Sequence, residues 1–488
     1  MSIAAARTGL IFDAGTFTGT QPSIESHFIC GKGLIDSRTV FLIMNRGCDC
    51  EFEDRLQRNT ALHITRTIEQ AAQAGAPLLY VQDQLGDPGG GFDTTRVITA
   101  DLSTLLLSPS GMGRVSACLA RFAQHHLMVS AILGPTSGPL ALPLMLADLV
   151  MMTRKGALCM GRPDMVRAML GQECDLQSLG GAQVHSEAGS AQLVFDDEQA
   201  LFACARKLIS LGHRQAPRRR ARGPRPRPLH IGSLIPRDPG RPYDAHSLIE
   251  AVADAHSLVE ISPHHAPEVL TGFATVGKHP MALIANNPRH QSGAIQGPSA
   301  RKMVRAIRVA DKLHIPIVFF ADVPGFMIGK EAERSGIFSA AAELFSAHVR
   351  STVPKILIVV RKAYTGGLYA MHGPGFDPVA ILAYPHANIG VFGVKTMEAI
   401  LESAPPEKRR VVELLRREIS APARLAEKGL VTEVIDPADT REKILHHLAP
   451  FFAAEASSGQ PAASGSKTAP RRGPANVSKA PAPLRKRA

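Results

Sequence analysis

Two adjacent glycines, Gly366 and Gly367, are the residues best placed for chemistry in this sequence. They follow an apolar run rich in β-branched residues (356–360) and precede LYAM (368–371), which has helical character. Glycine permits a positive φ and close approach of a ligand, and a helix N-terminus favours negative charge. The pair therefore predicts a turn whose amides stabilise an oxyanion. A tight turn without a ligand is the alternative.

The elements expected around this turn are those of an α/β fold with a mostly parallel sheet. The run at 356–360 is apolar without interruption, as is typical of a strand buried on both faces. The segment ALHITRTIEQAAQAGAPLLYVQD (61–83) is an amphipathic helix that leads into a buried strand, and 28–45 alternates as a strand pair with a glycine turn. We expect the turn to join one such strand to a helix.

The same order of elements occurs twice in the chain. AGAPLLYVQD (74–83) parallels HIPIVFFAD (314–322), each with a helix end, a proline, an apolar strand and an aspartate. LMVSAILGPTSGPLALPLML (127–146) parallels KILIVVRKAYTGGLYAM (355–371), each with an apolar strand, a glycine-containing turn and an apolar helix. This order predicts two halves of one α/β unit, and 45% hydrophobic content in 488 residues suffices for two cores.

Several stretches resemble a known family. HIPIVFFADVPGFMIGKEAE (314–333), the central stretch at 353–371, PVAILAYPHANIGVFGVKTMEAI (378–400) and RLAEKGLVTEVIDP (424–437) together resemble the C-terminal half of the carboxyltransferase (β) subunit of biotin-dependent acyl-CoA carboxylases, of the propionyl-CoA and acetyl-CoA carboxylase type. LIFDAGTF (10–17) is similar to the opening of these subunits.

The resemblance implies two tandem crotonase-like ββα-superhelix domains. It implies an N-terminal carboxyltransferase domain for acyl-CoA at 1–213, a basic linker at 214–230, a C-terminal domain for biotin at 231–453 and a disordered basic tail at 454–488. The N-domain of one subunit and the C-domain of another act together, so the resemblance also implies a homo-oligomer, a dimer-based hexamer.

The resemblance also implies the reaction and its residues. Carboxybiotin releases carbon dioxide, its base removes the α-proton of the acyl-CoA, and the enolate attacks the carbon dioxide. Since biotin carries this chemistry, neither a metal nor a nucleophilic side chain is expected in this subunit. The resemblance maps catalytic amides onto Gly138 in the N-domain and onto Gly366 and Gly367 in the C-domain, and substrate-binding roles onto Gly134, Gly325, Phe326, Tyr364 and Tyr369.

The N-terminal half departs from the family pattern. Where members read G-P-x-x-G-G-A, this chain reads GPTSGPL (134–140), and Pro139 has no N–H to donate. Gly138 is then the sole amide of that pair, and the loop at 83–88 also differs from the family's DSGGAR. Pro139 therefore keeps open a catalytically degenerate paralogue that acts as an assembly or regulatory subunit. A decarboxylase of a malonyl-type CoA also stays open, since it would use the same oxyanion holes and the sequence does not separate the direction of the reaction.

The amino-acid composition also limits the possible partners and the cellular compartment of the protein. The net charge of +12 is concentrated in the linker at 214–230 and the tail from 454, and without Trp and with five Tyr we do not expect nucleic-acid binding. Seven cysteines without a CxxC pair argue against a disulfide framework and a zinc ribbon. No run of 18 apolar residues and no signal peptide occurs, which predicts a cytoplasmic protein without a membrane partner.

Biotin is expected on another polypeptide. No attachment context of the Ala-Met-Lys-Met kind occurs in the sequence, and no ATP-grasp signature. The predicted partners are therefore a biotin carboxylase and biotin carboxyl carrier (α) subunit, which brings carboxybiotin, and a coenzyme A thioester as substrate.

Overall fold

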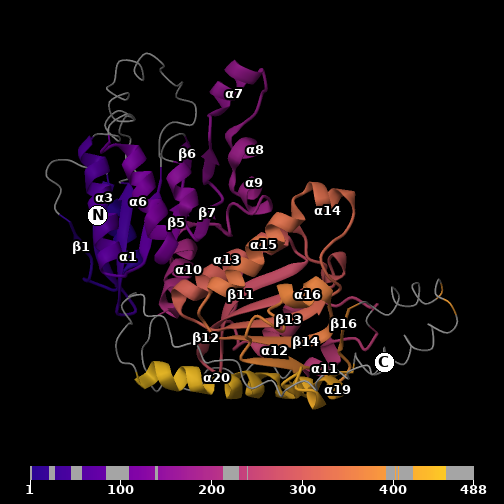
Figure 1. The fold of residues 1–488 in the computed structure, drawn as a ribbon. Coiled ribbons are helices and arrows are strands. Elements are labelled where there is room, and N and C mark those ends of the chain that lie inside the picture. The colour runs from indigo at the N-terminus through magenta and orange to yellow at the C-terminus, as the bar shows by residue number, and fades with distance from the viewer. Residues whose placement is uncertain are drawn as a thin grey trace, which may run out of the picture.

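Helices and strands alternate along two halves of the chain (Figure 1). The structure, a computed structural model, describes residues 3–20, 28–45, 58–83, 109–137, 141–212, 230–238, 240–391, 402, 405 and 421–457. Most of the predicted linker, the tail beyond Ser457 and the loop at 84–88 lie outside these residues. The predicted α/β fold class is confirmed.

A seven-stranded sheet forms the N-terminal half in the order β1-β2-β3-β4-β5-β7-β9. It begins with antiparallel pairs and is parallel from β3 onward. Its strands are β1 (Thr18–Gly19), β2 (Phe28–Ile35), β3 (Arg38–Asn45), β4 (Leu78–Gln82), β5 (Met128–Ile132), β7 (Leu149–Thr153) and β9 (Leu193–Phe195). Two short strands, β6 (Pro135–Ser137) and β8 (Ala157–Cys159), pair separately in parallel. The helices of this half are α1 (Ile3–Ile11), α3 (Arg58–Gln73), α6 (Met112–His125), α7 (Pro163–Leu170), α8 (Leu176–Gly180), α9 (Ala182–Glu187) and α10 (Glu198–Leu211).

An eight-stranded sheet forms the C-terminal half in the order β10-β11-β12-β13-β14-β15-β17, with β16 also paired to β14. It too begins antiparallel and is parallel from β12 onward. Its strands are β10 (Val259–Ile261), β11 (Val269–Val276), β12 (His279–Asn286), β13 (Ile317–Val323), β14 (Lys355–Tyr364), β15 (Ala380–Ala383), β16 (Asn388–Gly390) and β17 (Glu433–Val434). The helices are α11 (Ile231–Leu234), α12 (Ala245–Val252), α13 (Gly297–Leu313), α14 (Lys330–Arg334), α15 (Ile337–Arg350), α16 (Thr365–Ala370), α19 (Pro422–Glu427) and α20 (Thr440–Ser457).

The two sheets repeat one topology, so the predicted duplication is present in three dimensions. Each sheet has an antiparallel hairpin, β2–β3 or β11–β12, followed by a parallel run of strands. Local capping agrees with these elements: Asp197 accepts a hydrogen bond from Ala200 N at the start of α10, and Gln296 and Ser299 form a capping box at the start of α13.

One of three apolar clusters spans both halves. A cluster of buried side chains runs without a break from α10, through Phe202 and Ile209, to α13, through Ile307 and Ala310. α13 lies between the two sheets, and α20 runs along the outer edge of the C-terminal half in yellow (Figure 1). This last helix continues past residue 453, the expected end of the domain, to Ser457. No helix in the described ranges is long and apolar enough to cross a membrane.

Candidate active site

The predicted strand, turn and helix around the two glycines are present. All ten residues of β14 are buried, and its last residue, Tyr364, is the N-cap of α16. Thr365 has a φ of 42°, in the left-handed region that residues other than glycine rarely adopt. Such strain is commonly found at functional sites. The chain therefore turns sharply at Thr365, directly before Gly366.

Four residues that the sequence singled out lie in contact at this turn. A Cβ atom on Gly367 would lie 2.9 Å from the Cα of Gly325, and one on Gly366 would lie 3.2 Å from Cδ2 of Phe326. Gly325 has a φ of 138°, which favours glycine at that position. The turn after β13 therefore packs against the turn after β14, and Gly367 is needed because backbone fills the space where its side chain would be.

The two predicted tyrosines have different surroundings. Tyr364 is buried, and burial, with a smaller effect of the Asp322 charge, raises the pKa of its phenol. Tyr369 is 45% exposed, and its ring centroid lies 6.4 Å from that of Phe376. Tyr369 therefore lies at the surface beside the turn and is not part of the helix core.

A neighbouring loop is fixed against the turn by hydrogen bonds. Asn286, at the end of β12, accepts from the backbone N–H of Asp322 (3.2 Å) and donates to the carbonyl of Gly293 (3.1 Å). The N–H of Ile295 donates to the carbonyl of Gly325 (3.0 Å). The ends of β12, β13 and β14 are thereby held together at one edge of the sheet, where ligands of parallel sheets commonly bind.

A buried ionic cluster lies behind the turn. Nε of Arg361 donates to the carboxylate of Asp322 at 2.7 Å, and Nζ of Lys362 lies 3.6 Å from the other oxygen. Arg361 also lies over the ring of Tyr243, 4.8 Å from its centroid. Burial raises the pKa of Asp322, and the two cations oppose this shift. Sequence reasoning used Asp322 and Arg361-Lys362 only as family landmarks, because nothing local showed that they meet.

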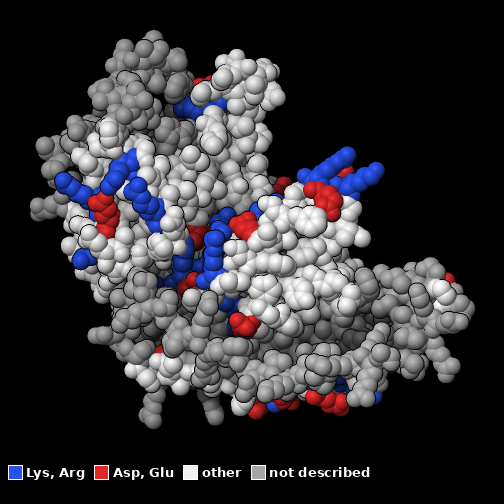
Figure 2. All heavy atoms as spheres, in the orientation of Figure 1, with Lys and Arg blue, Asp and Glu red and all other residues white. Residues whose placement is uncertain are grey.

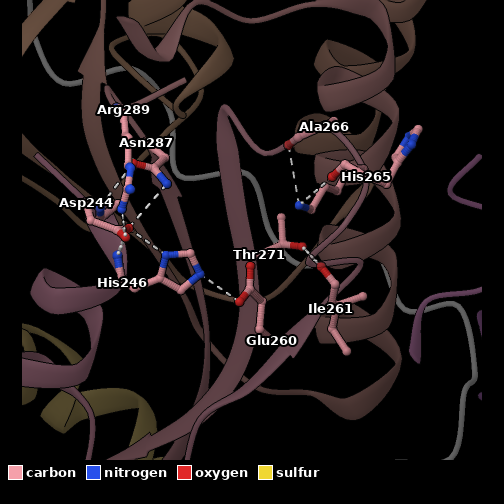
Figure 3. A network of polar contacts seen from close by, with 11 residues as sticks. Asp244, His246, Glu260, Ile261, His265, Ala266, Thr271, Asn287 and Arg289 are labelled. Carbon is pink, nitrogen blue, oxygen red and sulfur yellow. Dashed lines mark hydrogen bonds and ion pairs between the residues drawn. The ribbon is translucent and has the colours of Figure 1, made fainter. Parts of the chain in front are cut away.

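Asn287, the residue after Asn286, belongs to a different network (Figure 3). His246 lies between two carboxylates, with Nδ1 2.6 Å from Asp244 and Nε2 2.8 Å from Glu260. Nη1 of Arg289 donates to Asp244 at 3.3 Å, and Asn287 holds the start of α12 through the N–H of Ala245 (3.2 Å). These contacts join α12, β10 and the end of β12, so the network is structural.

The N-terminal counterpart of the turn is described only in part. Gly134 follows β5 and is buried, whereas Gly138, Pro139 and Leu140 lie outside the described residues. Nε2 of His185 lies 2.7 Å from the carbonyl of Leu158, a structural hydrogen bond.

The pairing of strands aligns the two halves residue by residue. Asp83 N donates to Asn45 and Asp322 N to Asn286, which makes the two aspartates equivalent. Ser137, the last residue of β6, pairs with β8. In the same way Tyr364, the last residue of β14, pairs with β16. Counting back from these two residues, Gly134 corresponds to Arg361 and Pro135 corresponds to Lys362.

Comparison with known proteins agrees with this architecture. The model of the carboxyl transferase domain family matches residues 8–458. The chain belongs to the carboxyl transferase family. A putative propionyl-CoA carboxylase beta chain from Bacillus subtilis (strain 168) is 29% identical to this chain, over 90% of this chain and 89% of the relative.

Two further relatives extend the comparison. The alpha subunit of a methylmalonyl-CoA decarboxylase from Propionigenium modestum is 27% identical over 90% of this chain and 88% of the relative. A crystal structure of transcarboxylase 12S, whose description names a hexamer assembly and bound, hydrolysed methylmalonyl-coenzyme A, superposes with a TM-score of 0.80 at 25% identity. The superposition covers 95% of this chain and 92% of the transcarboxylase 12S chain. The crotonase-like fold expected from the sequence is thus confirmed.

A large cavity lies elsewhere on the molecule, between its two halves. It has a volume of about 2090 Å³, and none of the predicted site residues lines it. Figure 2 shows Lys and Arg side chains along this junction. The cationic residues that α13 contributes to its wall are Arg301, Arg305, Arg308 and Lys312. Arg305 and Lys312 bind carbonyls or a carboxylate of the N-terminal half, so they join the halves.

Proposed function

We propose that this chain is the carboxyltransferase subunit of a biotin-dependent acyl-CoA carboxylase of the cytoplasm. It would move a carboxyl group from carboxybiotin on a partner subunit to the α-carbon of an acyl-CoA. The observation that carries the proposal is the contact of Gly325 and Phe326 with Gly366 and Gly367 at the end of β14. The relatives named as propionyl-CoA carboxylase and transcarboxylase support the same reaction class.

The turn after β14 is the proposed biotin side of the site. Gly366 keeps part of its surface exposed, so the backbone is open to a ligand where the chain enters α16. When bound, biotin supplies the carboxyl group and a ureido oxygen that takes up negative charge. The amides of Gly366 and of its neighbours Thr365 and Gly367 would donate to that oxygen. Gly367 also provides the close contact to Gly325.

The N-terminal half is the proposed acyl-CoA side, with Gly134 after β5 and with Gly138, which lies outside the described residues, as its proposed amide donor. The acyl-side turn of one subunit would meet the biotin-side turn of another subunit, so the site would be completed by oligomerisation. Exposed apolar side chains support this on both halves. They are Met160 before α7, Met165, Met169 and Leu170 in α7, Ile328 before α14, Phe338 in α15 and Tyr369 in α16. The crystal structure of transcarboxylase 12S is that of a hexamer.

The test removes the amide of Gly366. We expect Gly366→Pro, assayed with a biotinylated carboxylase partner and a panel of short acyl-CoAs, to lower the transfer rate about 10²- to 10³-fold, because one oxyanion donor is lost. Size-exclusion profiles and circular dichroism identify misfolded variants. Full activity of a correctly assembled Gly366→Pro variant would contradict the assignment of the turn.

Two other functions have a specific observation in their favour. The relative named as a methylmalonyl-CoA decarboxylase subunit favours decarboxylation of a malonyl-type CoA at the same turn. Pro139, which cannot donate a hydrogen bond, favours a degenerate paralogue that assembles with active subunits. Decarboxylation by the wild type without acyl-CoA carboxylation would support the first. An inactive wild type that gains turnover on Pro139→Gly would support the second.

A further inference from the structure

The ionic cluster behind the turn carries more positive than negative charge. One carboxylate, Asp322, faces two cations, the guanidinium of Arg361 at 2.7 Å and the ammonium of Lys362 at 3.6 Å. The Asp322 side chain is 0% exposed, that of Arg361 is 4% exposed and that of Lys362 is 11% exposed. Because buried charges are costly unless paired, an excess cation at this place needs a reason.

A bulge in the sheet brings both cations to one aspartate. Ala321 of β13 pairs with Val359 of β14, and the next pair is Val323 with Ala363. A single residue of β13, Asp322, therefore lies opposite three residues of β14, of which two are the cations. Bulges of this kind occur next to active sites, where they redirect side chains.

At the equivalent place in the N-terminal half, negative charges outnumber positive charges. The register makes Gly134 and Pro135 the counterparts of Arg361 and Lys362. The equivalent aspartate, Asp83, is paired with Arg7 of α1 at 2.5 Å, and Arg7 is shared with Glu198 at 2.8 Å. Two carboxylates thus face one cation here. The two turns therefore share one topology but differ in the net charge of the buried groups beside them.

Hydrogen bonding in the C-terminal cluster is incomplete. Nε of Arg361 binds Asp322, and Nη1 donates to backbone carbonyls of the segment before α12. Nη2 of Arg361 and Oδ1 of Asp322 are buried without a hydrogen-bond partner among the described residues. An unpaired buried donor on a charged group is costly, so such a group commonly has an unseen partner such as a water molecule or an anion.

We infer that Lys362, supported by Arg361, forms a subsite for a carboxylate anion beside the turn after β14. This inference rests on the proposed function: the anion is the carboxylate carried on the ureido group at the biotin side. Lys362 precedes Thr365 by three residues of extended chain, which span at most about 10 Å. Lys362 is also the most exposed member of the cluster, so an anion at its edge would balance the excess charge.

The test uses the full chain and measures binding apart from turnover. Binding of 13C-bicarbonate, a small planar stand-in for the carboxylate, is followed by NMR line broadening. We expect Lys362→Met to weaken binding at least about tenfold, because it removes one unit charge in contact with the anion where the effective dielectric constant is near 20. Lys362→Arg should retain it. Lys428→Met, which removes an exposed lysine after α19, is the matched control and should change nothing.

A second measurement connects the subsite to transfer. With free biotin as acceptor of the carboxyl group from methylmalonyl-CoA, Lys362→Met should lower kcat/KM for biotin at least about tenfold, and Lys362→Arg should restore most of it. Lys362→Met leaves the Asp322–Arg361 pair in place, and thermal unfolding checks the fold. Unchanged bicarbonate binding in folded Lys362→Met overturns the inference. If Lys362→Met weakens bicarbonate binding but the wild-type chain transfers no carboxyl group, the subsite is supported and the proposed function is refuted instead.

Discussion

Gly366 and Gly367 are adjacent in the sequence, yet an added methyl group would meet different neighbours at each. At Gly367 it would meet the Cα of Gly325 at 2.9 Å, which is backbone and cannot move aside, and at Gly366 the ring of Phe326 at 3.2 Å, which can shift. We expect Gly367→Ala to lower the free energy of unfolding by about 1–3 kcal/mol through overpacking. Gly366→Ala, the matched control, should cost less than about 1 kcal/mol. Urea denaturation of both variants checks this, and equal losses would contradict the packing role of Gly367.

Between elements, the stability of the junction of α12 and β10 depends on pH through His246. Hydrogen bonds to Glu260 and, secondly, to Asp244 raise the pKa of this imidazole to about 9. Since the folded pKa lies above the usual value of 6.5, the stabilisation is complete below pH 6.5 and is lost as pH rises through about 9. His246→Gln should therefore lower Tm at pH 6 and have no effect above pH 9.5.

The comparison of Tm for wild type and variant between pH 6 and 9.5 isolates this group. Glu260→Gln removes the partner with the largest effect and should reduce the pH dependence in the same way. A constant difference between wild type and His246→Gln across the whole range would show that the imidazole does not titrate there.

In the molecule as a whole, the junction of the halves depends on a nearly buried ion pair. Lys312 of α13 binds the carboxylate of Asp148 in the N-terminal half, and both side chains are about a tenth exposed. Asp148 also accepts from the N–H of Met128 at 2.9 Å. Asp148→Asn leaves the buried charge of Lys312 without its counter-ion and should destabilise the chain by about 3–5 kcal/mol.

Urea unfolding followed by circular dichroism measures this loss. The exposed pair of Arg154 and Asp196 supplies a control, since Asp196→Asn should cost less than about 1 kcal/mol. Because the core is continuous across both halves, the wild type should unfold in one transition. Two separate transitions would show that the halves unfold independently.

The sequence by itself determined the elements and their repetition. Uninterrupted apolar runs such as 356–360 predict buried strands because both faces of a parallel sheet are covered, and this signal is local. The repeated order of strand, turn and helix predicted two halves, and the motifs around Asp322 and Gly366 identified the family. The departure at Pro139 was also visible in the sequence, since proline lacks an N–H wherever it lies.

Only the tertiary structure decided which of these residues meet. Asp322 faces Arg361 and Lys362 because of a bulge between β13 and β14, and a bulge is set by pairing between distant strands, not by local preference. Gly367 is required by the backbone of Gly325, which is far away in the sequence. The equivalence of Pro135 and Lys362 likewise follows from ladder register. A shift of one residue would change which residues of the two halves correspond, and only the assembled sheet fixes that register.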